Sequence, residues 1–336
     1  MAKESTAKIT CKGINQVAIA VRDIEKVAEN YWNILGIGPW AIFDWESPLV
    51  YDRKYHGKKA WGREKIALAQ VGNVQLELVS PVEGPSIYGD WIAEHGEGLH
   101  HLNFLVDDVD EAQRVLVEEG FVSLQSGKFE PRRLKGGYDY IDTWPLRAIW
   151  EPVVYAGEIG AEPKMFPADP NAVSPAKIKC KGINQVAIAV KDIEKVAENY
   201  WNILGIGPWA IFDWESPLVY DRKYHGKKAW GREKIALTQV GDVQLELVSP
   251  VEGPSIYGDW IAERGEGLHH LNFLVDDVDE AQRVLVEEGF VSLQSGKFEP
   301  RRLKGGYDYI DTWPLRAIWE PVVYAGEIGA EPRMHP

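Results

Sequence analysis

The sequence predicts an α+β protein that contains two tandem copies of one domain, each copy made of two β-α-β-β-β halves. Two internal repeats support this fold class. Residues 8–167 align without a gap on residues 177–336, at an offset of 169. Within the first copy, a strand-then-helix pattern that begins at Gln16 returns at His101, at an offset of 85. A chain of 336 residues is also long for a single core and suits two domains.

The two copies are nearly identical, so both are expected to adopt the same fold and to carry the same chemistry. They differ at seven of 160 aligned positions: Thr10/Lys179, Arg22/Lys191, Ala69/Thr238, Asn73/Asp242, His95/Arg264, Lys164/Arg333 and Phe166/His335. We expect a first domain over residues 8–162 and a second over 178–336. The segment 163–177, PKMFPADPNAVSPAK, is rich in Pro and small or polar residues, which favours an extended linker.

The first half of each copy is expected to run strand, helix and three further strands. QVAIAV alternates apolar residues from Gln16, which is typical of a strand. Asp23 is a good helix N-cap, and apolar residues then recur at helical spacing up to Leu35. Three runs of β-type residues follow, namely WAIFDW, KIALAQVG and VQLELVSP.

The second half repeats this order. A strand begins at His101, Asp108 is the expected N-cap of the next helix, and Gly120 is expected to close that helix. The runs FVSLQ, YDYIDT and RAIWEPVVY are the expected strands after it. The segment 84–98, GPSIYGDWIAEHGEG, joins the halves, and its apolar spacing predicts a short helix.

Composition excludes several classes of function. The chain carries 37 basic and 51 acidic residues, a formal charge of −14, which disfavours binding to a nucleic acid backbone. Each copy has one cysteine, Cys11 or Cys180, so no disulfide framework is expected and a reducing compartment is the simpler interpretation. The start, MAKESTAKIT, has no apolar signal region, and no run approaches a membrane span. We expect a soluble cytoplasmic protein with no nucleic acid and no membrane partner.

Four polar residues at corresponding strands are the candidate site. Side chains alternate along a regular strand, so His100 and His101 are expected to point in opposite directions. His101 marks the start of one half and Gln16 the start of the other. The last strand of each half carries a carboxylate, Glu77 or Glu151, among apolar residues.

Buried carboxylates are costly unless they are paired or bind a cation. Gln16, Glu77, His101 and Glu151 together offer three oxygens and one nitrogen, with a charge that a divalent ion would neutralise. Each residue alone has a simpler interpretation: Gln16 as a polar residue at a sheet edge, Glu77 as a solvent-facing side chain, and His101 as a hydrogen-bonded core histidine.

Longer motifs connect these residues to a known family. INQVAIAVRDIEKVAENYWNILGIGPW resembles the opening of the vicinal oxygen chelate superfamily, which includes glyoxalases, bleomycin-resistance proteins and dioxygenases. ELVSPVEGPSIYGDWIAEHGEGLHHLNFLVDDVDEAQ resembles more narrowly the methylmalonyl-CoA epimerase branch. The likeness covers about residues 13–155 and 182–324.

The resemblance implies paired β-α-β-β-β units that form a U-shaped mixed sheet and hold a divalent metal, such as Zn, Co, Ni, Mn or Mg, on its concave face. The ligands it implies are Gln16, Glu77, His101 and Glu151 in the first copy and Gln185, Glu246, His270 and Glu320 in the second. The epimerases usually have histidine where Gln16 stands and glutamine where Glu77 stands. The set in this chain is similar to that of eukaryotic glyoxalase I, although no glutathione-binding pattern is present.

The implied reaction is removal of a proton α to a carbonyl, with stabilisation of a metal-bound enediolate, by an enzyme of the isomerase or epimerase type. Glu151 is the first choice for the base and Glu77 the opposing choice, with Glu320 and Glu246 as their counterparts. Acids in the segment 44–64 are further candidates: Asp44, Glu46, Asp52 and Glu64.

The expected partner is a small-molecule substrate, with an acyl-CoA thioester as the first candidate. Aromatic residues available to line its pocket are Trp40, Phe43, Trp45, Tyr51, Trp61, Tyr138, Tyr140 and Trp144, although many of them could instead pack the core. Basic residues that could meet a nucleotide phosphate, or form a solvated loop face, are Lys58, Lys59, Arg132, Arg133 and Lys135.

Three other functions stay open at this point. One is a glyoxalase I-like lyase. Another is an extradiol-type dioxygenase, which needs two histidines and one carboxylate on iron. The third is a metal-free binding protein of the bleomycin-resistance type, which has no need of two inward carboxylates. The two copies are expected to pair as an intramolecular pseudo-dimer or within a homo-oligomer.

Overall fold

The structure is a computed structural model, and it describes residues 7–129, 136–154, 159–298, 305–323 and 330–335. The chain divides into two compact units with the boundary between Ala176 and Lys177. Each unit contains one mixed sheet of 11 strands, and six α-helices are present in the described part of the chain. The predicted fold class is therefore confirmed.

In the first unit, the three helices are α1 (Ile24–Leu35), α2 (Ile87–His95) and α3 (Val109–Glu118), with a 3-10 turn, η1 (Trp144–Leu146). Its strands are β1 (Ile14–Ala20), β2 (Trp40–Trp45), β3 (Val50–Tyr55), β4 (Lys58–Lys59), β5 (Arg63–Val71), β6 (Val74–Glu83), β7 (Gly98–Leu105), β8 (Val122–Phe129), β9 (Gly136–Thr143), β10 (Ala148–Val153) and β11 (Lys164–Phe166).

The second unit repeats these elements with helices α4 (Ile193–Leu204), α5 (Ile256–Arg264) and α6 (Val278–Glu287) and the turn η2 (Trp313–Leu315). Its strands are β12 (Ile183–Ala189), β13 (Trp209–Trp214), β14 (Val219–Tyr224), β15 (Lys227–Lys228), β16 (Arg232–Val240), β17 (Val243–Glu252), β18 (Gly267–Leu274), β19 (Val291–Phe298), β20 (Gly305–Thr312), β21 (Ala317–Val322) and β22 (Arg333–His335).

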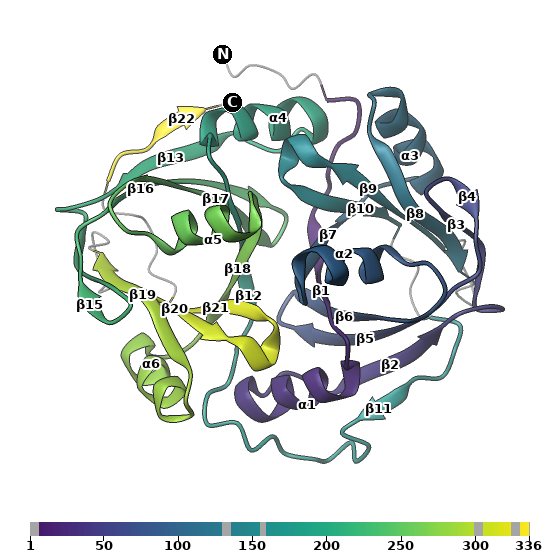
Figure 1. Ribbon diagram of the computed structural model, residues 1–336, viewed down its shortest axis with the longest axis horizontal. Helices are drawn as coiled ribbons and strands as arrows, with labels where there is room; N and C mark the ends of the chain where they lie inside the picture. Colours follow the sequence, from purple (N-terminus) through teal and green to yellow (C-terminus); the bar gives the residue numbers. More distant parts are fainter. Residues whose placement is uncertain (1–6, 130–135, 155–158, 299–304, 324–329, 336) are drawn as a thin grey trace. The chain divides into compact units, whose positions relative to one another are not determined.

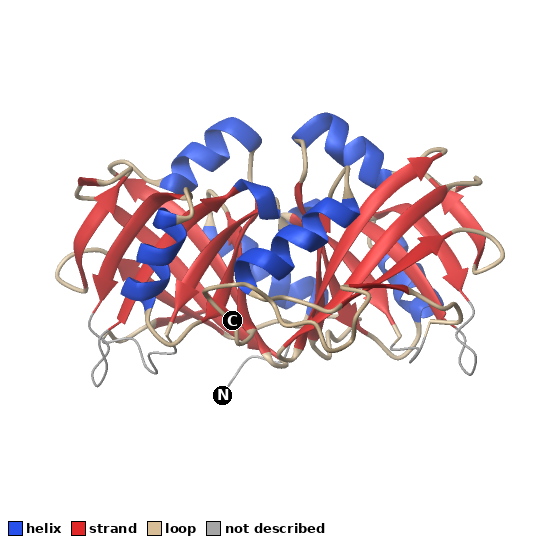
Figure 2. Ribbon diagram, turned by 90° about the horizontal axis from the view of Figure 1, so that it is seen from below, coloured by secondary structure: helices blue, strands red, loops and turns tan. Residues whose placement is uncertain are grey.

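The strand order of the first unit is β11-β2-β5-β6-β1-β7-β10-β9-β8-β3-β4 (Figure 1). The two halves meet where β1 pairs antiparallel with β7. On either side of this seam the next strand is parallel, β6 beside β1 and β10 beside β7. The last strand of each half thus lies next to its first strand, in the same way in both halves. Figure 2 shows the strands of each unit side by side in one twisted sheet.

Local signals in the sequence explain where the helices begin and end. The Asp23 side chain accepts a hydrogen bond from the backbone N–H of Lys26, and α1 ends at Gly36 in a left-handed conformation, with φ of 68°. Asp108 caps α3 in the same way through Glu111. Both predicted N-caps are confirmed, and the short helix expected between the halves is α2.

Two pairings were not expected from the sequence. The hairpin β3–β4 leaves the first half of the unit and pairs with β8 of the second half. Residues 164–166, which belong to the expected linker, form β11 and pair antiparallel with β2. Short polar strands such as these give no clear alternation of apolar residues, so periodicity does not reveal them.

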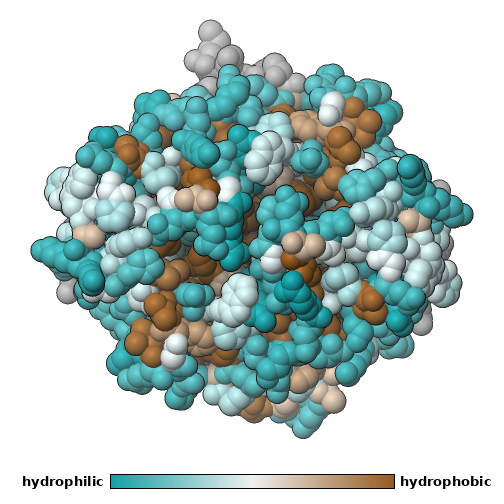
Figure 3. Space-filling model, in the orientation of Figure 1, coloured by the Kyte–Doolittle hydropathy of each residue, from teal (hydrophilic) through white to brown (hydrophobic). Residues whose placement is uncertain are grey.

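The core of the first unit follows the apolar positions of the strands, and Val17, Leu102, Phe104 and Trp150 are fully buried. On the face of the molecule drawn in Figure 3 the exposed residues are mainly hydrophilic, with apolar side chains in small patches. None of the described helices is both long and apolar enough to cross a membrane. Both cysteines are free thiols.

Candidate functional site

Four predicted ligands lie in two adjacent rows that cross the centre of the sheet. One row pairs Gln75 on β6 with Gln16 on β1, Gln16 with Asn103 on β7, and Asn103 with Glu151 on β10. We call these four residues the amide row. The neighbouring row pairs Glu77 with Ala18 and Ala18 with His101. Residues two apart along a strand share a face, so the two rows lie side by side on the same face of the sheet.

His101 lies between two carboxylates. Its Nε2 atom is 3.3 Å from Glu77 Oε2 and 3.3 Å from Glu151 Oε2, and all three side chains are buried. The small side chain of Ala18, between Glu77 and His101 in the row, leaves room for this approach. Neither His101 Nε2 nor Glu77 Oε2 makes a hydrogen bond of normal geometry. Two buried polar atoms are thus left without full hydrogen-bond satisfaction, which is unusual in a folded protein.

Gln16 reaches this cluster through Asn103. Asn103 Nδ2 donates to Gln16 Oε1 and to Glu151 Oε2, each at 3.2 Å, and Gln16 Nε2 donates to Gln75 Oε1 at 2.7 Å. The structure therefore brings Glu77, His101 and Glu151 close together and connects Gln16 to them by two hydrogen bonds through Asn103. As the side chains stand, the described residues hold no complete group of three or more His, Cys, Asp or Glu ligands around an ion position.

Burial and charge act against each other in this cluster. Burial alone would lower the pKa of His101, but the carboxylates of Glu151 and Glu77 outweigh it and raise the pKa to about 9. Burial raises the pKa of the Glu77 carboxyl, and His101 offsets part of that rise. The pKa of His100 is lowered well below its usual range, first by burial and then by the neighbouring charge of His101.

The expectation that His100 faces away from His101 is wrong. The pairing of β7 with β1 shifts between His101 and Leu99, so His100 has no partner on β1. This β-bulge breaks the alternation and brings the two Nδ1 atoms to 2.8 Å. The direction of this contact depends on the tautomers: where a neutral His100 accepts, Nδ1–H of His101 donates and its Nε2 faces the carboxylates. His100 thus fixes the orientation of the His101 ring.

A pocket of about 370 Å³ lies against these rows. Of the aromatic residues predicted to line it, Trp45, Tyr138 and Tyr140 do so, and Phe129 joins them. The others lie elsewhere: Trp40 is fully buried, Phe43 packs in the core, Trp61 and Trp144 are largely exposed, and Tyr51 is partly buried outside the lining. Residues not predicted from the sequence also line it, namely Asn15, Gln70, Asn73, Gln75 and Asn103.

The further acids and bases expected near the site do not gather in this pocket. Glu64 is buried but pairs with Arg53, and Asp44, Glu46 and Asp52 are absent from the lining. Lys58 is exposed on β4, and Lys59 borders a separate cavity of about 250 Å³. Arg132, Arg133 and Lys135 lie outside the described residues.

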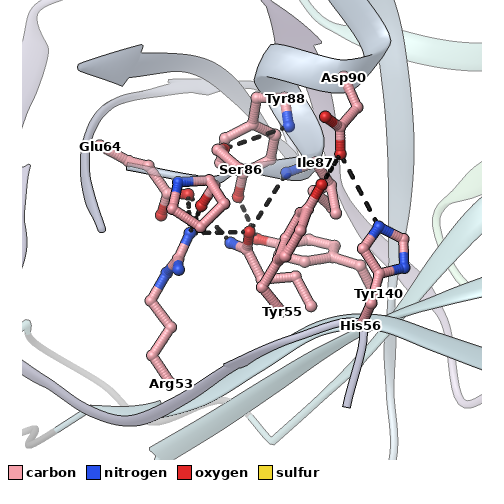
Figure 4. A network of polar contacts seen from close by, with 11 residues as sticks. Arg53, Tyr55, His56, Glu64, Ser86, Ile87, Tyr88, Asp90 and Tyr140 are labelled. Carbon is pink, nitrogen blue, oxygen red and sulfur yellow. Dashed lines mark hydrogen bonds and ion pairs between the residues drawn. The ribbon is translucent and has the colours of Figure 1, made fainter. Parts of the chain in front are cut away.

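A buried polar network supports Tyr140, one of the aromatic residues that line the pocket (Figure 4). Arg53 Nη2 donates to Glu64 Oε1 at 2.8 Å, to Gln125 Oε1 and to the Pro85 carbonyl, just before α2. From α2, the Tyr88 hydroxyl donates to that of Tyr140 at 2.7 Å.

Both tyrosine rings lie near the central histidine. The Tyr88 ring is inclined by 23° to the His101 ring at a centroid distance of 6.4 Å, and the Tyr140 ring lies 4.7 Å from His101, centroid to centroid. The network and α2 thereby fix two rings beside the candidate site.

The second unit reproduces the cluster. His270 Nε2 lies 3.3 Å from Glu246 Oε2 and 3.4 Å from Glu320 Oε2. Asn272 donates to Gln185 and to Glu320, and Gln185 donates to Gln244. The set predicted for the second copy is therefore arranged like that of the first.

Solved structures share this architecture. A variant of 4-hydroxymandelate synthase from Streptomyces coelicolor superposes with a TM-score of 0.62 and 15% identity, covering 96% of this chain and 95% of that one. A fusion of a xylose isomerase-like TIM barrel with a 4-hydroxyphenylpyruvate dioxygenase gives a TM-score of 0.54 and 14% identity, covering 97% of this chain and 51% of that one. At these identities the likeness shows the fold alone.

Sequence comparison shows the family. The model of the Glyoxalase/Bleomycin resistance protein/Dioxygenase superfamily matches residues 15–139 and again residues 184–308. The chain therefore belongs to this superfamily. Among curated proteins, the ethylmalonyl-CoA/methylmalonyl-CoA epimerase of Cereibacter sphaeroides is 32% identical over 116 residues, 34% of this chain and 76% of that protein. The uncharacterised protein YqjC of Bacillus subtilis is 28% identical over 106 residues, 32% of this chain and 66% of that protein.

Proposed function

We propose that each unit is a divalent-metal-dependent isomerase that removes a proton α to the carbonyl of a small-molecule substrate. One observation carries the proposal. His101 Nε2 lies 3.3 Å from an oxygen of each of two buried carboxylates beside a pocket of about 370 Å³. The name of the epimerase relative supports the same reaction class.

The chemistry of the donor atoms and their distances from His101 support a metal ion at this cluster. Ligand atoms that share an ion at about 2.1 Å lie roughly 3.0–3.4 Å apart, and the imidazole nitrogen has that spacing to one oxygen of each carboxylate. Glu77 Oε2 and His101 Nε2 also lack hydrogen bonds of normal geometry. Glu77, His101 and Glu151 would hold the ion, with Gln16 as the fourth ligand through Oε1, which has two lone pairs and can accept from Asn103 at the same time. A bound divalent ion supplies positive charge where the substrate carbonyl oxygen becomes negative.

The protein's own groups have distinct tasks. Glu151 takes the α-proton on one of its carboxylate oxygens, and Asn103 Nδ2 keeps that carboxylate oriented. Glu77 lies across His101 from Glu151, so it can return a proton to the opposite face. Tyr138, Tyr140 and Trp45 provide apolar ring faces along the pocket. His100 orients His101 through the contact between their Nδ1 atoms.

The same donor set bears on the alternatives. One imidazole and two carboxylates do not match the two histidines and one carboxylate of an extradiol iron site. Two buried inward carboxylates would serve no purpose in a metal-free binding protein. A glyoxalase I-like lyase shares the proton-transfer step, so substrate choice alone separates it from an epimerase.

Metal analysis and isotope exchange together test the proposal. Purified protein is expected to contain close to two divalent ions per chain. In D₂O it should exchange the α-hydrogen of an acyl-CoA thioester, a glutathione hemithioacetal or another carbonyl compound. Metal-replete protein that binds no ion would rule the proposal out. Exchange restricted to the hemithioacetal would assign the lyase activity.

A further inference from the structure

We infer that the amide row recognises a neutral carbonyl compound that bears hydroxyl groups, such as a ketose or a sugar lactone. This inference rests on the proposed function of the same pocket. It concerns Gln75, Gln16, Asn103 and Glu151, together with their counterparts Gln244, Gln185, Asn272 and Glu320 in the second unit.

The direction of the hydrogen bonds along the row is set at one end. A carboxylate only accepts hydrogen bonds, so Asn103 must present Nδ2 to Glu151. The same Nδ2 donates to Gln16 Oε1, and Gln16 then offers Nε2 to Gln75 Oε1. Gln75 ends the row with an Nε2 donor that has no partner among the described residues. The row is therefore polarised, and it ends at the pocket with a donor for a substrate oxygen.

The rest of the pocket suits a hydroxylated molecule. Three more carboxamides line it, those of Asn15, Gln70 and Asn73. A carboxamide both donates and accepts, which matches hydroxyl groups that do the same. Trp45 and Phe129 line the same pocket and provide apolar ring faces for the carbon skeleton of a bound ligand.

The charges in the pocket disfavour an anion. Among the described residues that line it, the charged ones are Glu77 and Glu151, and no Lys or Arg is present. A divalent ion would balance these two carboxylates, and no described lining residue would then pair with an anionic substrate group. In the second unit Asp242 stands at the position that corresponds to Asn73, which lines the pocket of the first unit, so this position carries a further negative charge. A neutral substrate tolerates this difference between the units, whereas an anionic one would not.

The test measures binding and turnover separately on the full-length protein. Saturation-transfer NMR and calorimetry, with and without metal, would compare D-fructose and D-glucono-1,5-lactone with methylmalonyl-CoA. The first variant combines Gln75→Leu with Gln244→Leu, and the second combines Gln75→Glu with Gln244→Glu. Asn33→Ala with Asn202→Ala, exposed on α1 and α4, is the matched control. Circular dichroism would check that each variant is folded.

We expect the neutral probes to bind, and the leucine variant to weaken their binding roughly tenfold, as the loss of one hydrogen bond should. The glutamate variant keeps the size of the side chain but removes the donor, so it should weaken binding too, while the control should not. The inference is overturned if no neutral probe binds, if methylmalonyl-CoA binds more tightly, or if the leucine variant binds the neutral probes normally.

The two hypotheses can fail independently. Exchange of the α-hydrogen of methylmalonyl-CoA would keep the proposed function and reject the neutral substrate class. Specific binding of the neutral probes without any exchange by metal-loaded protein would keep the substrate class and reject the proposed reaction.

Discussion

Two properties of Glu151 make it the expected base. It faces the pocket, and one of its oxygens accepts from Asn103 while lying 3.3 Å from His101. We predict that Glu151→Gln together with Glu320→Gln lowers the rate of α-hydrogen exchange at least about 100-fold, because an amide cannot take the proton. The exchange would be followed by mass spectrometry in D₂O.

Glu83→Gln with Glu252→Gln is a suitable control, since these carboxylates lie at the exposed ends of β6 and β17. It should leave the rate of exchange unchanged. Full activity of the Glu151 and Glu320 double variant would show that another group is the base, and Glu77 would then be tested in the same way.

Asp139 is a buried acid on β9, outside the main pocket. Its Oδ1 accepts from Ser123 at 2.5 Å, whereas Oδ2 has no hydrogen-bond partner. Burial raises the pKa of Asp139 to about 7. The hydrogen bonds of Ser123 and Gln113 oppose this rise, the charge of Glu151 adds to it, and the charge of Lys54 opposes it. In the unfolded chain the same carboxyl titrates near 3.8.

This difference in pKa predicts how stability depends on pH. Between about pH 4 and pH 7 the unfolded state releases the proton and the folded state keeps it, so this residue lowers stability as pH rises through that window, and no further above it. Asp139→Asn with Asp308→Asn should therefore stabilise each unit by up to a few kcal/mol at pH 8 and by much less at pH 4. Thermal unfolding at several pH values would measure this.

Asp142→Asn with Asp311→Asn, which changes exposed acids of the same strands, is the matched control and should stabilise the units less at pH 8 than the buried pair does. Equal stabilisation by the Asp139 and Asp308 variant at both pH values would show that a lost charge is not the cause.

Strand β8 needs a glycine at position 127, where the side chain of Tyr138 from β9 packs against it. A Cβ added at Gly127 would lie 2.6 Å from the hydroxyl oxygen of Tyr138, whose ring is buried and lines the pocket. We predict that Gly127→Ala with Gly296→Ala lowers the free energy of unfolding by about 1–3 kcal/mol and weakens ligand binding, because the Tyr138 ring must shift. Chemical denaturation and calorimetry would measure the two effects.

Gly137→Ala with Gly306→Ala is the matched comparison on the facing strands. Its added Cβ would meet the Gly127 carbonyl at 3.5 Å, an ordinary contact. It should have the smaller effect on both quantities. The steric explanation fails if the two double variants behave alike.

Most of the elements could be predicted because their signals are local. Asp23 and Asp108 begin helices by capping, and the repeat at 85 residues indicates which strands correspond. The partners of His101 depend on pairing between distant strands, which the internal symmetry made predictable. The bulge at His100 could not be predicted, because it depends on the register of β7 against β1. Asn103 shares a face with His101 by the two-residue period, but an asparagine in a strand carries no signal of its own.

At the scale of the whole molecule, the chain contains two equivalent candidate centres. The distances in the acid–imidazole–acid cluster agree within 0.1 Å between the units. We predict that Glu151→Gln alone and Glu320→Gln alone each remove about half of the exchange activity. His101→Ala alone and His270→Ala alone should each lower the metal content by about one bound ion per chain. Kinetics and plasma mass spectrometry of the single and double variants would establish this. A single variant with no activity would show that the units depend on each other.

The ends of each sheet have a consequence for how the protein behaves in concentrated solution. In the first unit the outermost strands are β11 and β4. The first is three residues long and covers β2, while the second consists of two exposed lysines, Lys58 and Lys59. Short and charged outer strands are poor templates for the strands of another molecule. By covering β2, strand β11 therefore also protects the sheet from edge-to-edge aggregation.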